Sequence, residues 1–168
     1  TIADSPDLLI FGEMGIGNTT TSAAIAAALL EVKAEEITGN GTGVDAPGRA
    51  RKVRVIDQAL AHHGLAEAGI CPEQILCAVG GLEIAAITGA IIAASQRRIP
   101  VLLDGFIVSV AALAALRLNP SCRPFLLASH QSVEQGHRLV LRALGVRPLI
   151  DLDLRLGEGS GAAVTLPL

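Results

Sequence analysis

Aromatic side chains are nearly absent from this sequence. Its 168 residues include three Phe but neither Tyr nor Trp. Proteins that bind single-stranded nucleic acid stack the bases on aromatic rings, and this chain has almost none to offer. Its formal net charge of −3 and isoelectric point near 5.8 also provide no general basic surface for a phosphate backbone. The composition therefore argues against nucleic acid as a partner and favours a small-molecule substrate.

Cysteine is scarce as well. The sequence has three cysteines, Cys71, Cys77 and Cys122, an odd number with no Cys-x-x-Cys pair. It therefore indicates neither a disulfide framework nor a zinc site. We expect free thiols in a reducing, cytoplasmic compartment. The four histidines lack the close spacing of metal ligands, and no metal is expected. No Gly-x-Ser-x-Gly elbow is present either, which argues against covalent catalysis by serine.

Long apolar runs are also missing. The longest, residues 84–95, is interrupted by Thr88 and is shorter than the roughly 20 residues that span a bilayer. No charged segment followed by an apolar one opens the chain, so we expect neither a membrane span nor a signal peptide. The first residue is Thr1 rather than Met, and we expect a fragment or a processed product.

The sequence is 51% hydrophobic and only 17% charged, which is typical of helices packed on a buried sheet. Short apolar runs predict buried strands at residues 8–11, 75–79, 101–103 and 125–128, and an extended or mixed segment at 149–156. Helices are predicted at residues 19–31, 45–64, 82–98, 106–118 and 132–144. Strands that alternate with helices predict a single parallel α/β domain over residues 1–168.

Polar residues follow several of these predicted strands. Glu13 comes after the first strand and Asp104 after the strand at 101–103. Ser129 and His130 follow the next one. In open α/β sheets, ligands bind outside the carboxyl ends of the strands, so we expect one binding crevice at that edge.

The first glycine-rich loop, residues 12–17, has the features of an anion cradle. Glycine lets the backbone approach a ligand, and the amides of a helix N-terminus face a negative group, which makes Gly15, Gly17 and Asn18 binding candidates. The lysine of a Walker A loop is missing, and the glycine order does not fit the dinucleotide fingerprint. A tight turn with Asn18 or Thr19 as helix N-cap would explain the same residues without a ligand.

The second loop, residues 39–43, leads into a helix whose first turns are crowded with cations. They are Arg49, Arg51, Lys52 and Arg54. The helix dipole disfavours cations at this end, so a phosphate held by Lys52 and the loop amides would compensate. The loop residues concerned are Gly41, Thr42 and Gly43. A solvated basic face paired with Asp45 or Asp57 is the alternative.

Glu158 lies between Gly157 and Gly159, just before the small and apolar residues 162–166. A carboxylate in such a loop is a candidate general base. A loop glutamate that pairs with a cation or receives helix amides would have the same pattern. Glu83, inside the apolar residues 82–87, is the other candidate for a buried carboxylate, but the helix dipole explains its position and we do not assign it to catalysis.

Four segments taken together identify a family. They cover residues 12–29, 38–60, 80–113 and 129–163, and they contain the runs GEMGIGN, TGNGTG, LLDGF and LGEGSG. In this order they resemble nicotinate-nucleotide:dimethylbenzimidazole phosphoribosyltransferase over nearly the whole chain. An ordered series of this length is more specific than any one glycine loop. The chain looks like the larger, C-terminal part of such an enzyme.

The resemblance implies transfer of phosphoribosyl from nicotinate mononucleotide to dimethylbenzimidazole or a related base, giving α-ribazole 5'-phosphate in cobalamin biosynthesis. It also implies a Rossmann-like three-layer fold with helices on both faces of the sheet, a homodimer, and no cofactor. Glu158 matches the glutamate assigned as the base, and Glu13 lies in the same site, so both are predicted to be catalytic. The predicted substrate-binding residues are Gly15, Gly17, Asn18, Gly41, Thr42, Gly43, Lys52, Gly80, Gly81, Asp104 and Gly157.

This sequence departs from the family in two ways. Family members are longer, and their N-terminal portion, which helps form the benzimidazole pocket, has no counterpart here. Asn40 stands where an arginine is common. The alternative to catalysis is a fragment that holds a phosphorylated ligand through Lys52 without turnover, independently of Glu158. A reductase-like nucleotide domain is disfavoured by the missing dinucleotide fingerprint.

Overall fold

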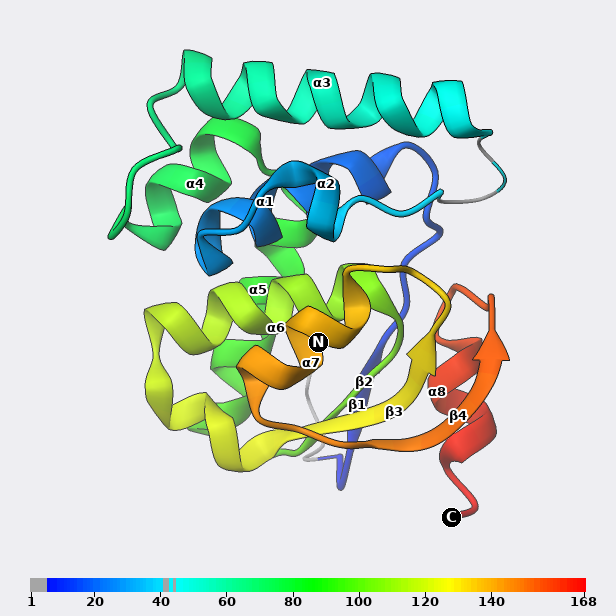
Figure 1. Cartoon of the computed structure of the whole chain (residues 1–168). Helices are drawn as coiled ribbons and strands as arrows, with labels where there is room; N and C mark the ends of the chain where they lie inside the picture. Colours follow the sequence, from blue (N-terminus) through cyan, green and yellow to red (C-terminus); the bar gives the residue numbers. More distant parts are fainter. Residues whose placement is uncertain (1–5, 41–42, 44) are drawn as a thin grey trace.

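A four-stranded parallel sheet organises the computed structural model, which describes residues 6–40, 43 and 45–168. The strands are β1 (Leu9–Phe11), β2 (Val101–Leu103), β3 (Leu126–Ser132) and β4 (Pro148–Leu154). They pair in the order β1-β2-β3-β4, and every neighbouring pair is parallel. The predicted parallel α/β fold is therefore confirmed, and all strand ends that carry site residues meet at one edge (Figure 1).

Eight α-helices and one 3-10 helix connect and cover the described strands. They are α1 (Asn18–Leu30), α2 (Ala34–Ile37), α3 (Ala46–His62), α4 (Pro72–Val79), α5 (Leu82–Gln96), α6 (Phe106–Leu118), η1 (Pro120–Phe125), α7 (His137–Leu144) and α8 (Ser160–Thr165). Each strand pairs with the next in the chain, so right-handed crossovers bring α5, α6 and α7 to one face. The short helix α8 lies on the other side of the sheet (Figure 1).

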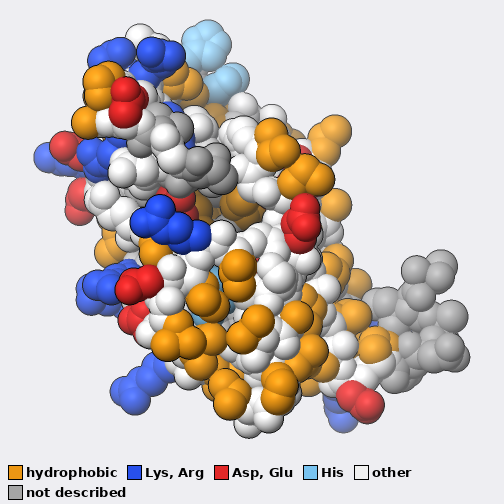
Figure 2. Space-filling model, turned by 90° about the vertical axis from the view of Figure 1, so that its right-hand side faces the viewer, with side chains coloured by type: hydrophobic (Ala, Val, Ile, Leu, Met, Phe, Trp, Pro, Cys, Tyr) orange, Lys and Arg blue, Asp and Glu red, His pale blue; other side chains and the backbone are white. Residues whose placement is uncertain are grey.

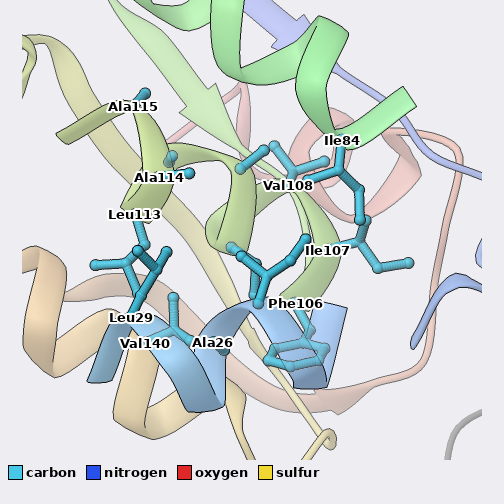
Figure 3. Close-up of a cluster of buried hydrophobic side chains, with 14 of the residues drawn as sticks. Ala26, Leu29, Ile84, Phe106, Ile107, Val108, Leu113, Ala114, Ala115 and Val140 are labelled. Carbon is cyan, nitrogen blue, oxygen red and sulfur yellow. The ribbon is translucent and has the colours of Figure 1, made fainter. Parts of the chain in front are cut away.

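Helix α6 is the centre of the hydrophobic core. Ten of its residues, from Phe106 to Ala115, are buried. Figure 3 shows its side chains meeting those of α1, α5 and α7, with Leu29, Ile84 and Val140 around them. The alanines of α1 and α6 are small enough to let these two helices pack closely, and each buried Leu or Ile contributes about 1.5–3 kcal/mol. This core supports the strand ends from one side.

The predicted strand at residues 75–79 is wrong, because these residues form the second half of α4. Pro72 occupies the start of this helix and Glu73 its first turn, where both are favourable. Ile75 alone is buried in α4. A short apolar run has the same pattern in a buried strand and in one turn and a half of helix, so its periodicity could not distinguish them.

The predicted helix at residues 132–144 begins only at His137, because β3 continues to Ser132. The Ser132 amide donates to Nδ1 of His137 at 3.0 Å, and this side-chain bond links the end of β3 to the first residue of α7. Helix α8 was not expected, whereas the extended segment predicted at 149–156 is confirmed as β4. No helix in the described ranges is both long enough and apolar enough to cross a membrane.

Candidate active site

A cavity of about 370 Å³ opens at the carboxyl edge of the sheet, where loops from all four strands converge. It is lined by Glu13, Met14, Gly15, Thr19, Gly43, Asp104, Gly105, Phe106, Ile107, Val108, Ser132, Val133, Glu134, Leu154, Arg155, Leu156 and Gly157. Five of the predicted site residues are among them: Glu13, Gly15, Gly43, Asp104 and Gly157. The expected crevice therefore exists where the topology of the sheet predicted it.

The first glycine-rich loop carries Glu13 into the cavity. The Glu13 carboxylate accepts a hydrogen bond from the amide of Gly15, which folds the loop back on itself. Gly15 and Gly17 have φ angles of 82° and 78°, a region that favours glycine. Helix α1 begins directly after Gly17 and has no side-chain cap, so the alternative explanation of this loop, a helix cap by Asn18 or Thr19, is wrong. The first amides of α1 lack the protein partner that a cap would supply.

Asn18 is the first residue of α1 and does not line the cavity. Its amide nitrogen donates to the Glu83 carboxylate at 3.2 Å, and its side chain is buried. Glu83 therefore pairs with Asn18 at the N-terminus of α5, which fits the structural role expected for it. Of the predicted binding residues, Gly17 and Asn18 lie near the cavity in sequence without lining it.

Lys52 is the only one of the four cations at the start of α3 that reaches the site. Its amine donates to the Thr19 hydroxyl at 3.0 Å and to the Gly39 carbonyl at 3.5 Å, and Thr19 lines the cavity. Burial lowers the pKa of the Lys52 amine, and the nearby Glu134 carboxylate raises it. The lysine is thus held beside the cavity by neutral oxygens and one acidic neighbour.

The arginines near Lys52 have other roles. Arg49 donates to the carbonyls of Thr38 at 2.8 Å and Glu35 at 2.7 Å, so it fixes α3 to α2. Arg51 and Arg54 are exposed. The predicted start of the helix is confirmed: the Asp45 carboxylate caps α3 by accepting from the Gly48 amide at 2.9 Å. Gly41 and Thr42, also predicted to bind, lie outside the described residues.

Glu158 sits on the loop between β4 and α8, beside Glu13. Its amide donates to the Glu13 carbonyl at 2.8 Å, which joins the two loops. Its own backbone is left-handed, with φ 59°, a conformation that costs a non-glycine residue about 1 kcal/mol. The side chain is exposed and does not line the cavity, although the preceding Gly157 does. The structure therefore brings the two predicted catalytic glutamates together through their backbones.

Close packing fixes this contact between the two loops. A Cβ atom added to Gly12 would lie 2.4 Å from the Glu158 carbonyl carbon and 2.7 Å from the Gly159 nitrogen. No real side chain tolerates such distances, so only glycine lets the end of β1 pass beneath the Glu158 loop.

The glycine pair Gly80 and Gly81 joins α4 to α5 away from the cavity lining. A Cβ atom at Gly80 would meet the Leu76 carbonyl oxygen at 2.2 Å, which gives this glycine a packing reason. The described residues therefore provide no contact between this pair and the cavity. Their predicted binding role stays a prediction.

Glu134, which was not predicted as a site residue, lines the cavity from the turn after β3. Its carboxylate packs against Gly39, and its charge raises the pKa of Lys52. A signal was available, because Glu134 follows the polar residues Ser129 and His130 that mark the carboxyl end of the same strand. Within the described ranges, no three His, Cys, Asp or Glu side chains gather as a metal site.

A model of the phosphoribosyltransferase family matches residues 1–168. The chain belongs to this family. A nicotinate-nucleotide–dimethylbenzimidazole phosphoribosyltransferase of Bradyrhizobium diazoefficiens is 81% identical over 166 residues, which are 99% of this chain and 47% of that protein. The protein of the same name from Azotobacter vinelandii is 58% identical over 161 residues, covering 96% of this chain and 45% of its own length.

Solved structures of this phosphoribosyltransferase family agree with the fold. The crystal structure of CobT from Thermus thermophilus superposes with a TM-score of 0.92 at 46% identity, covering 99% of this chain and 49% of that one. The predicted family is therefore confirmed. The chain spans about half the length of the curated relatives that it matches.

Proposed function

We propose that this chain carries the nucleotide-binding and base-activating part of a nicotinate-nucleotide–dimethylbenzimidazole phosphoribosyltransferase. One observation carries the proposal: a single cavity has a lysine-bearing side beside Thr19 and a paired-glutamate side formed by Glu13 and the Glu158 loop. Phosphoribosyl transfer needs both, because the phosphate must be fixed while charge develops at the anomeric carbon. The names of the relatives from Bradyrhizobium and Azotobacter support the same reaction.

In this proposal, Lys52 and the first amides of α1 hold the 5'-phosphate of nicotinate mononucleotide. The Lys52 amine already lies within 3.0 Å of the Thr19 hydroxyl, and Thr19 is in the first turn of α1. These α1 amides have no side-chain cap, and a phosphate is the group that a helix N-terminus favours. Gly15 and Gly43 also line the cavity.

The carboxylates of Glu13 and Glu158 act on the incoming base. The bond between the ribose anomeric carbon and the nicotinate nitrogen breaks, and nicotinate leaves with that electron pair. An unprotonated ring nitrogen of the benzimidazole attacks the anomeric carbon from the other face, which inverts β to α. The second ring nitrogen then gives its proton to the Glu158 carboxylate. A carboxylate near the anomeric carbon also stabilises the positive charge of the transition state, a role that suits Glu13.

The test is chromatography of reactions that contain nicotinate mononucleotide, dimethylbenzimidazole, or both. We expect nicotinate and α-ribazole 5'-phosphate to form together, and only when both substrates are present. The Bradyrhizobium diazoefficiens relative serves as the positive control. Ligand binding that depends on Lys52, with no product in any reaction, would instead favour the binding-fragment alternative.

We also propose that the chain acts as a homodimer in the cytoplasm. Figure 2 shows hydrophobic side chains gathered on the face that includes β4 and α8, and the exposed apolar residues of this region are Leu149, Leu152, Val164, Leu166 and Leu168. Exposed apolar patches mark contact surfaces. The exposed free thiols of Cys71 and Cys77 suit a reducing compartment. Sedimentation analysis should give the mass of a dimer, and a monomer at every concentration would contradict the first part.

A further inference from the structure

Asp104 makes contacts that a substrate-binding residue would not need. It follows β2 at the floor of the cavity, and only 3% of its surface is exposed. One carboxylate oxygen accepts from the Gly159 amide at 3.2 Å, and the other accepts from the Ala162 amide at 2.9 Å. Both bonds reach the loop and helix that follow β4, more than fifty positions along the chain. The side chain thus connects the end of β2 to the residues that directly follow Glu158.

These two amides are the ones that a helix cap would satisfy. Gly159 is the N-cap residue of α8, and no side chain of its own segment caps this helix. A carboxylate at a helix N-terminus is favoured by the dipole and makes stronger bonds than a neutral acceptor. Asp104 therefore caps α8 from another strand and anchors the loop in the same contact.

His130 packs against the same place from β3. Its Nδ1 lies 2.9 Å from the Ser129 hydroxyl, which itself donates to the Leu103 carbonyl at 2.6 Å. The Ser129 oxygen must therefore accept from Nδ1–H, which leaves Nε2 as an unprotonated acceptor. Burial lowers the pKa of His130, and the charge of Asp104 raises it. The neutral imidazole ring of His130 thus packs beside the Asp104 carboxylate.

Gly161 fits between these two side chains. A Cβ atom there would lie 2.3 Å from Cε1 of His130 and 2.9 Å from the nearer oxygen of Asp104. The first turn of α8 can approach Asp104 only because residue 161 has no side chain. The position of the loop is therefore fixed by the Asp104 carboxylate, the His130 ring and the close approach of Gly161.

We propose that Asp104 is a positioning residue that fixes the Glu158 loop against the Glu13 loop, so that both glutamates face one substrate in a constant relation. This inference rests on the proposed function for its catalytic meaning. It adds a positioning role to Asp104, which also lines the cavity and whose predicted role in substrate binding stays a prediction. Asp104 acts through the backbone of residues 157–162 and does not touch the reacting atoms.

The substitution Asp104→Asn keeps the shape of the side chain and exchanges one acceptor oxygen for an NH₂ donor. At least one of the two amides then loses its acceptor. By hydrogen exchange measured with NMR, we expect the amides of Gly159 and Ala162 to exchange at least about tenfold faster, while the amide of Leu113 in the core stays unchanged. In turnover assays, kcat should fall at least about tenfold, with KM for nicotinate mononucleotide changed by less than about threefold.

Asp151→Asn is the matched control. The exposed Asp151 carboxylate accepts from the Gln131 side chain at 2.7 Å, away from the cavity lining. It should change neither the exchange at Gly159 and Ala162 nor kcat. A second pair of variants tests the position of the loop without changing any charge. Gly161→Ala should lower kcat as Asp104→Asn does, because its Cβ would meet His130 and Asp104. Gly89→Ala, whose Cβ would meet nothing within 4 Å, should leave kcat unchanged.

The outcomes separate this inference from the proposed function. Unchanged exchange at both amides in Asp104→Asn overturns the positioning contact, whatever the turnover. Faster exchange with unchanged kcat overturns the link to Glu158. If the relative used as the positive control forms product and the unsubstituted chain does not, the proposed function of this chain is wrong. The exchange result then still decides whether Asp104 holds the loop, because that measurement needs no substrate.

Discussion

Acid should weaken this fold through one buried ring, that of His137. The side chain is fully buried at the start of α7. Its Nδ1 accepts from the Ser132 amide at 3.0 Å, so the proton is on Nε2, which lies 2.9 Å from the Ser109 hydroxyl. Burial, together with the nearby His130, lowers the pKa of His137 to about 3. Protonation of Nδ1 would place a donor against the Ser132 amide.

The sign and size of the effect follow from proton linkage. Above pH 6.5, His137 is neutral in both the folded and the unfolded chain, and its contribution to stability is complete. Below that pH, the unfolded chain takes up a proton, while the folded ring remains neutral down to about pH 3. The free energy of unfolding then falls by about 1.4 kcal/mol per pH unit, or about 3 kcal/mol between about pH 6.5 and 4.5.

Urea denaturation at several pH values between about 7 and 4.5 measures this loss. The variant His137→Asn keeps an acceptor near the Ser132 amide but does not titrate, so its lower stability should approach that of the unsubstituted chain as the pH falls. His62→Asn, on an exposed ring, is the control and should leave the pH dependence unchanged. Parallel curves for the unsubstituted chain and His137→Asn would refute the reasoning.

Three further predictions concern the cavity and the loop beside it. Lys52→Met should raise KM for nicotinate mononucleotide at least about tenfold, whereas the exposed Arg54→Met should change it by less than about threefold; similar KM values for the two would contradict the phosphate role. Gly12→Ala should lower the free energy of unfolding in urea by about 1–3 kcal/mol, because its Cβ would meet the Glu158 backbone, and an unchanged value would show that the loops are not packed this closely. Glu134→Gln removes the charge that raises the pKa of Lys52, so the lysine should lose its proton at a lower pH than in the unsubstituted chain. In calorimetric titrations at increasing alkaline pH, the affinity for nicotinate mononucleotide should therefore begin to fall at a lower pH. If it falls at the same pH as in the unsubstituted chain, Glu134 does not control the charge of Lys52.

Several elements could be predicted because their signals are local. Residues 101–103 form a short apolar run between Pro100 and Asp104, and they became β2 with the predicted bounds. Helix α6 has both predicted ends, since Gly105 precedes it and Asn119 and Pro120 stop it. Residues 75–79 could not be predicted in the same way, because a short apolar run lacks the length that separates a strand from a helix.

The site could be predicted in position but not in its internal contacts. The chain order of strands and polar residues placed Glu13 and Asp104 at one edge, and both line the cavity. The direction of the Asp104 carboxylate depends on amides far along the chain, and the role of His137 depends on its bonds to Ser109 and Ser132. Such long-range or single contacts leave no periodic signal in a sequence.

In the proposed reaction, the Glu158 carboxylate takes the proton of the incoming base. The direct measurement is steady-state turnover of Glu158→Gln, paired with the calorimetric affinity for nicotinate mononucleotide. Glu31→Gln is the matched control, because Glu31 has nearly the same left-handed backbone, with φ 56° against 59°, and lies outside the cavity lining. We expect kcat to fall at least about 100-fold in Glu158→Gln and to stay unchanged in Glu31→Gln, with unchanged affinity for nicotinate mononucleotide in both. Equal loss of affinity and kcat, or no loss of kcat, would contradict this role of Glu158.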